Sequence, residues 1–373
     1  MSRLESLYQR LKHEWLLLLF ALLAVVLAIA DPHGWRDYQR WLRLPTLAGL
    51  FGLMLAIQGI RDSGWVQRIA VSLVSRMHSL RGLGLLLVTS TALLSTVLTN
   101  DVSLFLLVPL TVAIGAMTNL PVLRMVILEA LAVNAGSTIS PIGNPQNLLL
   151  WQYQHLPLLT FVRVMLPAAA VMFALVALLT WFWLPRARIE LDNERLDHPQ
   201  ASMQLGLLSL VALSMMVLMM ENGQALLGAG LVIVPFLIER GPLRRLDWLL
   251  LATFAAIFLS LGHLAELPLV QNALSHLDLD RPLNLYLAGI LASQVISNVP
   301  ATVLLLDHAS DAMALAVAVN VGGFGLVIGS LANLIALRLA RQPGSMALFH
   351  RVSVPFLLVC GPAVYGVWMV MHR

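Results

Sequence analysis

Two matching segments, NAGSTISPIGNPQNL (Asn134 to Leu148) and NVGGFGLVIGSLANL (Asn320 to Leu334), each interrupt an apolar stretch of the chain. Aligned without gaps, they share their first asparagine, a glycine, an Ile-Gly pair and a final Asn-Leu pair. Each follows a second matching element, STVLTNDV (Ser95 to Val102) or SQVISNVP (Ser293 to Pro300). Glycines, prolines and amides at corresponding places in two hydrophobic segments are the best sequence pointer to a transporter binding site. Unwound backbone at membrane depth persists only where protein or a water-filled cavity satisfies its hydrogen bonds.

Composition places the chain in the membrane. Hydrophobic residues make up 59% of the sequence and charged residues 11%, against about 45–50% and 25% in soluble domains. Apolar runs near the length of a bilayer crossing recur throughout. The net charge of +4 comes from arginines at the ends of these runs, where topology determinants lie, and does not indicate nucleic-acid binding. The one cysteine, Cys360, cannot form an internal disulfide.

The N-terminus allows two interpretations. Basic residues followed by the apolar stretch Trp15–Ala30 are similar to a signal peptide. We favour an uncleaved helix, because the stretch is long for a signal core. The first two apolar runs also look like counterparts of two later ones.

The sequence predicts an all-α polytopic membrane protein built from two inverted repeats, each with a re-entrant hairpin and a broken transmembrane helix. The first repeat covers 1–184, a linker with an extra span (203–220) covers 185–220, and the second repeat covers 221–373. The first repeat contains spans 14–30 and 44–61, hairpin 82–116, broken span 123–151 and span 160–184. The second contains spans 223–239 and 246–262, hairpin 283–306, broken span 310–340 and span 352–371.

The two hairpins rest on length and on the polar residues at their midpoints. The pair 283–306 is too short to cross a bilayer twice. The pair 82–116 is longer, so an ordinary pair of spans around a polar turn remains an alternative. The stretches 62–80 and 264–277 each precede a hairpin, and the first alternates charged and apolar residues at helical spacing. We expect both to be helices lying in the membrane interface.

Parity of the crossings predicts the inversion. Five crossings separate span 44–61 from its counterpart 246–262, and an odd number turns the second half upside down. With a cytoplasmic N-terminus, most Lys and Arg residues lie inside, as the positive-inside rule requires. The C-terminus is then periplasmic, and the first hairpin opens to the cytoplasm.

Two hairpin tips and two helix breaks converging at mid-membrane would bring half-helix ends to one place. N-terminal ends suit an anion, and C-terminal ends and free carbonyls suit a cation. Neither Lys nor Arg occurs in the four elements. An anion would therefore be held by backbone amides, by Asn and Ser/Thr groups, or by a co-bound cation.

The candidate ligand-binding residues follow from these matched motifs. Asparagines at corresponding offsets favour a site, whereas asparagine in a membrane helix otherwise often ties helices together; that competing interpretation is stronger for Asn147 and Asn333. The predicted substrate- or ion-binding residues are Thr99, Asn100, Asp101, Asn134, Gly136, Ser137, Asn144, Ser297, Asn298, Asn320 and Gly322.

Two acids inside apolar sequence are the coupling candidates. A carboxylate at this depth costs at least about 2.5–3.5 kcal/mol and marks a functional site by default. Asp101 could carry a cation or a proton, or could cap its hairpin. Glu129 could do the same, or could bond a neighbouring helix. The matching positions in the second half are Val299 and Leu315, so the coupling chemistry is asymmetric.

A resident metal or organic cofactor is not expected. The histidines lie outside the four elements and have no metal-ligand spacing. Only a coupling Na⁺ or H⁺ is predicted.

At the segments TNDVSLFLLVPL, VNAGSTISPIGNPQNLL, ISNVPAT and AVNVGGFGLVIGSLANLIALR the chain resembles the ion-transporter superfamily. That superfamily holds arsenite efflux subunits, divalent anion:sodium symporters, citrate carriers and sodium:proton antiporters. The resemblance is closest to the YbiR-type anion transporters of the bacterial inner membrane. It implies inverted repeats, a homodimer and elevator-like movement. Dicarboxylate symporters carry Ser-Asn-Thr at both tips, whereas these tips read Thr-Asn-Asp and Ser-Asn-Val, which favours the arsenite-efflux side.

The resulting prediction is a secondary transporter of a small anion or oxyacid, coupled to protons or sodium and working by alternating access. Arsenite- or antimonite-type efflux and cation:proton antiport are alternatives. A channel is less favoured, because two inverted broken helices suit alternating access. An intramembrane enzyme is not expected, because no catalytic dyad or metal motif is present in the core segments.

Overall fold

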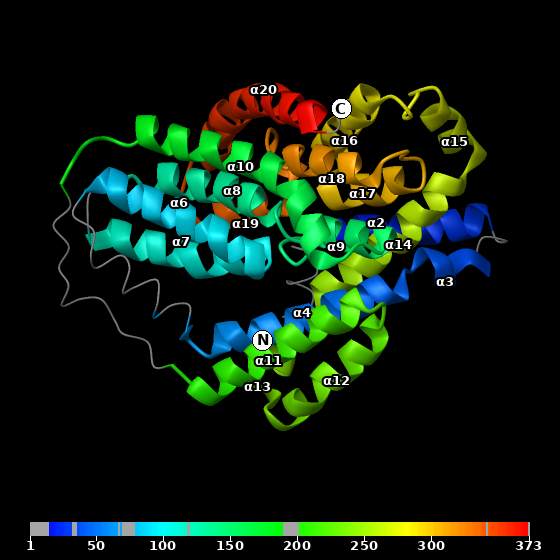
Figure 1. Ribbon diagram of the computed structural model, residues 1–373, viewed down its shortest axis with the longest axis horizontal. Coiled ribbons are helices and arrows are strands. Elements are labelled where there is room, and N and C mark those ends of the chain that lie inside the picture. Colours follow the sequence, from blue (N-terminus) through cyan, green and yellow to red (C-terminus); the bar gives the residue numbers. More distant parts are fainter. Residues whose placement is uncertain are drawn as a thin grey trace.

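The computed structural model describes residues 15–31, 36–65, 68, 79–117, 120–188, 201–340 and 342–371. Helices joined by short connections make up this part of the chain (Figure 1). Its β-type pairing is an isolated bridge between Ser79 and Arg188. The prediction of an all-α protein is therefore confirmed.

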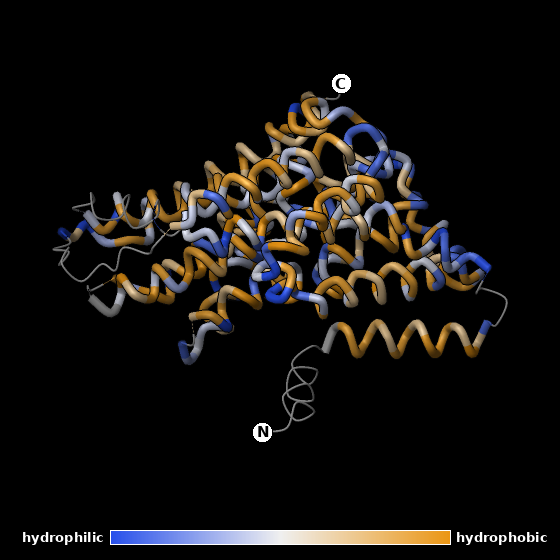
Figure 2. Tube along the Cα trace, turned by 90° about the horizontal axis from the view of Figure 1, so that it is seen from below, coloured by the Kyte–Doolittle hydropathy of each residue, from blue (hydrophilic) through white to orange (hydrophobic). Residues whose placement is uncertain are grey.

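Six helices in the described part of the chain are long and apolar enough to cross a membrane, and shorter apolar helices lie among them. Hydrophobic residues follow most of the helical length, and hydrophilic ones gather at helix ends and connections (Figure 2). Large apolar side chains are widely exposed, including Phe182 (75%) and Ile238 (83%). A water-soluble monomer would not expose apolar surface on this scale, so the outer helices face lipid.

The helices follow the predicted order. In the first part of the chain they are α2 (Trp15–Ala30), α3 (Tyr38–Trp41), α4 (Leu44–Asp62), α6 (Leu80–Val97), α7 (Asn100–Met117), α8 (Val122–Ser137), α9 (Pro145–Gln154) and α10 (Leu158–Trp183). In the second they are α11 (Met203–Glu221), α12 (Ala225–Ile238), α13 (Arg240–Arg245), α14 (Trp248–Glu266), α15 (Pro268–Ser275), α16 (Pro282–Ile296), α17 (Asn298–Leu306), α18 (Ala312–Val321), η3 (Val327–Gly329), α19 (Leu331–Ala340) and α20 (Ser345–Met371).

Matched spans pack across the two halves. Helix α2 packs against α14, and its counterpart α12 packs against α4. The extra span α11 lies against both α4 and α12. In Figure 1, α4, α11, α12 and α13 form the lower group of helices.

The hairpins and broken helices form the other group, in the upper part of Figure 1. Hairpin α6–α7 packs around α8, and hairpin α16–α17 packs around α18. The second arm of each hairpin contacts the second half of the other broken helix: α17 lies against α9, and α7 lies against α19. The two halves are thus interlocked, while their inversion relative to a membrane stays a prediction.

Two apolar stretches of the chain are each interrupted by unwound backbone. Helix α8 ends at Ser137, and α9 begins at Pro145, behind an Asn144 side chain that accepts from the Asn147 amide. Helix α18 ends at Val321, and Gly325 then takes a left-handed φ of 92°. Proline at a helix start and glycine at positive φ are the ordinary chemistry of such breaks.

The hairpins are short. Helix α16 has 15 residues, which corresponds to a length of about 22 Å, less than the roughly 30 Å of a hydrocarbon core. It turns into α17 through Ser297, which has a left-handed φ of 75°. Helix α6, with 18 residues, is long enough to cross alone, so the pair-of-spans alternative for the first hairpin stays open.

Two stretches differ from their predicted outlines. Helix α14 continues to Glu266, so the interfacial helix expected at 264–277 is represented by the shorter α15. Helix α20 begins at Ser345, ahead of the predicted 352, because the more polar residues before the apolar run also favour helix. Most of the stretch 62–80 lies outside the described residues.

Glycine 136 allows the first broken helix to touch the first hairpin. A Cβ atom at this position would collide with the Ala92 carbonyl oxygen and lie 2.5 Å from Ser95 Oγ. We predict that Gly136→Ala destabilises the protein by roughly 1–3 kcal/mol or more, the usual cost of overpacking. Thermal unfolding in detergent measures this. Gly230→Ala in α12 is the control, since its Cβ would meet no atom within 4 Å; equal melting temperatures for the two variants would contradict the packing.

Candidate functional site

The asparagines of the two helix breaks bond to each other across the halves. Asn134 Nδ2 donates to Asn333 Oδ1 at 2.9 Å. Asn320 Nδ2 donates to Asn147 Oδ1 at 2.6 Å. The first asparagine of each break therefore binds the last asparagine of the other. All four side chains are buried.

The same asparagines also make matched bonds within their own breaks. The first asparagine of each break donates to the backbone carbonyl four residues earlier. The last asparagine donates to the carbonyl of the residue that follows the glycine of its break. These bonds run from Asn134 to Ala130 O (2.9 Å), Asn320 to Ala316 O (2.7 Å), Asn147 to Ser137 O (3.1 Å) and Asn333 to Gly323 O (2.8 Å). Corresponding residues thus play corresponding roles in the two halves, and we call this set the crossed amide network.

Further amides hold the unwound backbone of the first break. Asn147 Nδ2 also donates to the carbonyls of Thr138 and Ser140 at 3.1 and 3.2 Å. Asn144 Nδ2 donates to the Ser137 carbonyl, to the Ser137 hydroxyl and to Asn320 Oδ1. Buried carbonyls are satisfied in this way at a depth where water is scarce.

In the second break, Gln294 bonds the unwound backbone. It is not among the residues predicted from the sequence. Its Nε2 donates to the carbonyls of Gly322 (2.6 Å) and Phe324 (3.0 Å), and its Oε1 accepts from the Leu326 amide (2.7 Å). The signal was available in the alignment of the hairpins. Gln294 matches Thr96, whose hydroxyl donates to the Gly136 carbonyl at 3.2 Å.

The glycines at the two breaks receive the hairpins. Gly136 lies against Ser95 and Gly322 lies against Ser293, so matching residues are again in contact. These predicted site glycines are positions of close approach between backbones, and their contacts set the distance between hairpin and break.

The asparagine at each tip bonds the backbone amide of the residue that follows it. Asn100 Oδ1 accepts from the Asp101 amide, and Asn298 Oδ1 accepts from the Val299 amide, both at 2.9 Å. The Asn100 amide also donates to the Gly143 carbonyl at 2.9 Å, which joins the first tip to the first break.

The hydroxyl residues beside the tip asparagines differ in their surroundings. Thr99 is half-buried, and its carbonyl accepts from the amide and the hydroxyl of Ser103. Ser297 is 1% exposed, and its Oγ has no hydrogen-bond partner.

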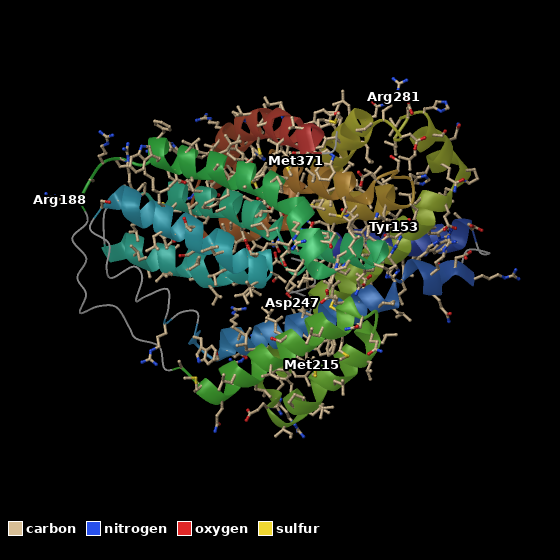
Figure 3. The ribbon with its side chains drawn as sticks, viewed as in Figure 1. Tyr153, Arg188, Met215, Asp247, Arg281 and Met371 are labelled. Carbon is tan, nitrogen blue, oxygen red and sulfur yellow. The ribbon has the colours of Figure 1, made fainter. Side chains whose placement is uncertain are left out.

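Asp101 lies half-buried in the first turn of α7. The exposed carboxylate of Asp247, just before α14, acts on it electrostatically, and Figure 3 places Asp247 in the centre of the molecule, between the two groups. The Arg61 guanidinium stacks over the Phe105 ring, one turn after Asp101, at 5.1 Å. The negative charge of Asp247 therefore acts on Asp101, while Arg61 of α4 contacts the same helix one turn further on.

Glu129 is fully buried and separate from the crossed amide network. Its Oε1 accepts from the Thr111 hydroxyl at 2.6 Å, and its Oε2 has no partner. Around it lies an apolar cluster from α7, α8 and α19 that includes Val126, Ala130 and Val133. The hydroxyl partner was not foreseen, because it comes from the far arm of the hairpin. Among the described residues, groups of three or more His, Cys, Asp or Glu that could hold a metal ion do not occur.

Two broken helices that contact each other, each packed against a helical hairpin, are an arrangement found in membrane transporters. The profile of the citrate transporter family, CitMHS, matches residues 7–312. The chain belongs to that family.

Similar proteins agree with this class. The chain is 40% identical to inner membrane protein YbiR of Escherichia coli over 329 residues, which is 88% of this chain and 87% of that protein. It is 31% identical to an uncharacterized transporter of Methanocaldococcus jannaschii, over 94% of this chain and 92% of that one. A shorter match, 30% identical over 142 residues, links it to silicon efflux transporter LSI3 of Oryza sativa, covering 38% of this chain and 29% of that protein. The chain is a multi-pass inner membrane transporter.

The crossed bonds predict thermodynamic coupling between the halves. Asn134→Ala and Asn333→Ala each remove the bond that joins the two side chains, so the double variant should lose less than the two single losses together. We expect a coupling free energy of about 0.5–3 kcal/mol, as for other contacting pairs. Equilibrium unfolding in mixed detergent measures it.

The matched control pairs Asn134→Ala with Asn222→Ala. Asn222 is exposed and donates only within its own helix end, to Leu218 O. This pair should be additive. Additive losses for Asn134 and Asn333 as well would contradict the crossed network.

Proposed function

We propose that this chain is a secondary active transporter of a small anion or oxyacid, coupled to a proton or sodium gradient and working by alternating access. The crossed amide network carries the proposal. It gathers two helix breaks and the hairpins that touch them into one buried polar centre. Buried polar backbone at membrane depth is the usual setting of substrate and coupling-ion sites.

Within this centre the residues divide into two roles. One set donates its side-chain amide hydrogens to other protein groups and so maintains the shape of the site: Asn134, Asn144 and Asn320. The residues proposed to meet the solute or ion lie mainly at the tips, where the chain turns: Thr99, Asn100, Asp101, Ser297 and Asn298. Gly136, Ser137 and Gly322 supply backbone and a hydroxyl next to them.

We assign the coupling step to Asp101, with Glu129 as the second candidate. Asp101 stands at the first tip, where the preceding Asn100 amide bonds the first break, and the negative charge of Asp247 acts on it. Binding a cation or proton there would change its charge at the boundary between the groups. Glu129 has a free Oε2 but sits in apolar surroundings with a single polar neighbour.

Alternating access requires the hairpin group to move against the lower group of α4, α11, α12 and α13. The side-chain interactions that join the two groups are weak enough to break and re-form. Arg43 forms an ion pair with Asp307 at 3.2 Å, with Asp307 more than half exposed, and Arg61 stacks on Phe105. Exposed ion pairs are worth about 0–1 kcal/mol each, which suits a boundary that re-forms in every cycle.

Efflux of an undissociated or singly charged oxyacid, of the arsenite or antimonite kind, is the favoured alternative in direction and substrate. An acid follows the first tip asparagine, and part of the chain is similar to a silicon efflux transporter. Cation:proton antiport through Asp101 and Glu129 is a further alternative, and it predicts flux without any solute.

Reconstituted protein tests the proposal. Purified transporter in proteoliposomes is given imposed pH or sodium gradients, and the flux of oxyanions, carboxylates and arsenite is measured. Gradient-driven flux of one of them is expected. Proton–cation exchange with no solute flux would instead establish the antiporter, and a solute flux that ignores both gradients would contradict coupling.

Asp101→Asn is predicted to abolish accumulation against a gradient, because the amide cannot change charge, while exchange of substrate across the membrane persists. Folding and substrate binding should be largely intact. Glu129→Gln should have a smaller effect. Uptake into proteoliposomes under imposed gradients measures both, and unchanged gradient-driven uptake in Asp101→Asn would leave Asp101 as a hairpin cap.

We further propose that the N-terminus is cytoplasmic, the C-terminus periplasmic and the protein a homodimer. Reporter fusions should place residue 1 and the loop 185–202 in the cytoplasm and Arg373 in the periplasm. Both termini on one side would mean that a span is miscounted, with 82–116 the first suspect. Mass measurement in native detergent micelles tests the dimer.

A further inference from the structure

Gln146 is a buried polar residue at the start of α9 whose carbonyl oxygen has no partner. The residue is 2% exposed, and its Oε1 makes no hydrogen bond. A buried acceptor without a donor costs about 1–3 kcal/mol. A native protein leaves such an atom unpaired where a ligand or a water completes it.

The hydrogen bonds of the neighbouring asparagines indicate which way the Gln146 amide is turned. Asn147 Nδ2 donates to three backbone carbonyls, so its Oδ1 must accept, and it does so from Asn320 Nδ2. Asn320 Oδ1 is therefore an acceptor, and it receives Asn144 Nδ2 at 2.9 Å and Gln146 Nε2 at 3.5 Å. Turning the Gln146 amide around would set two oxygens against each other. Its Oε1 is thereby directed away from the network as an acceptor.

Three backbone amides at the helix starts around this point are bonded by asparagine side chains. Asn144 Oδ1 takes the Asn147 amide, Asn100 Oδ1 takes the Asp101 amide, and Asn298 Oδ1 takes the Val299 amide. Pro145 and Pro300, at the starts of α9 and α17, have no N–H to offer. The half-helix N-termini thus offer an anion fewer donors than the sequence led us to expect.

Among the described residues, the buried side-chain atoms without a partner at the breaks and at the second tip are oxygens. Ser297 Oγ, on the hairpin whose second arm packs against α9, has no partner, and neither does Ser330 Oγ, which stands where Asn144 stands in the first break. Hydroxyls can donate or accept, whereas Gln146 Oε1 can only accept. A solute that carries its own O–H groups fits this set better than one that carries only acceptors.

We infer that Gln146 is a specificity-determining residue whose Oε1 accepts a hydrogen bond from a hydroxyl of the transported solute. The site therefore selects an undissociated or partly protonated oxyacid over a fully ionised anion. This inference rests on the proposed transport function and narrows its substrate class. A site built to bind a hydroxyl rejects a solute that lacks one, because the buried acceptor is then left unpaired.

Transport by reconstituted protein tests the inference with four probes. Arsenous and silicic acids keep hydroxyl protons at neutral pH, and sulfate and succinate do not. Wild-type protein should transport at least one of the first two and discriminate against the others. Gln146→Met removes the acceptor at similar size, and it should raise KM for that probe roughly 5- to 100-fold, the equivalent of one buried hydrogen bond, with a smaller change in kcat.

Gln152→Met is the matched control. Gln152 lies on the same helix, its Oε1 is also unpaired, and its Nε2 contacts Pro45 O on α4, away from the network. Its substitution should leave KM unchanged. Wild-type thermal unfolding gives a reading that needs no variant: the hydroxylated probes should raise the melting temperature and sulfate should not, because only bound ligands stabilise the folded state.

Three results would overturn the inference while leaving transport in place. They are preferred flux of sulfate or succinate, an unchanged KM in Gln146→Met, and a change confined to sodium dependence. The second would assign Oε1 to a water and the third to the coupling ion. Flux of none of the four probes under either gradient would count against the proposed function itself.

Discussion

Unwound backbone inside a membrane must find its hydrogen bonds within the protein, and the rest of this structure depends on that requirement. Two spans are broken, and the carbonyls freed at each break are bonded by side-chain amides. In the first break Asn147 binds three of them; in the second Asn333 and Gln294 share the work. Because these amides sit on other helices or beyond the break, the helices must stay close. The glycines at the contacts allow the hairpins to approach the breaks closely enough for these bonds to form.

The two halves solve the backbone problem alike but differ in their chemistry. Thr96 in the first hairpin touches one carbonyl, whereas Gln294 in the second fills the space beside two carbonyls and an amide. Asp101 has Val299 as its counterpart. A charge that can change exists at one tip only, and the second break is closed mostly by the protein's own groups. The symmetric frame therefore supports a polar centre that is not symmetric.

The order of the helices, the breaks and the hairpin turns could be predicted from the sequence, because apolar runs, glycines and prolines act locally. Partners could not. Matching offsets identified Asn134 and Asn333 as related to their counterparts, but their bond to each other depends on how α8 meets α19. Gln294, Gln146 and Thr111 were missed for the same reason: each is an ordinary polar residue until a helix from elsewhere is packed against it. Fewer helix-end amides are free than the sequence led us to expect. Side chains bond some of them, and those bonds can be identified only from the three-dimensional structure.

The crossed pairing has a consequence for the ancestry of the chain. In a half-length precursor, the asparagines would have kept the bonds within their own break, but the first would have had no last asparagine of another break to bind. Two copies facing each other supply the missing partners, since corresponding residues play the same role in each half. Duplication and fusion would then have preserved contacts that began between subunits. A substitution at 134 in a descendant is constrained by 333, almost two hundred residues away, as well as by its own neighbours.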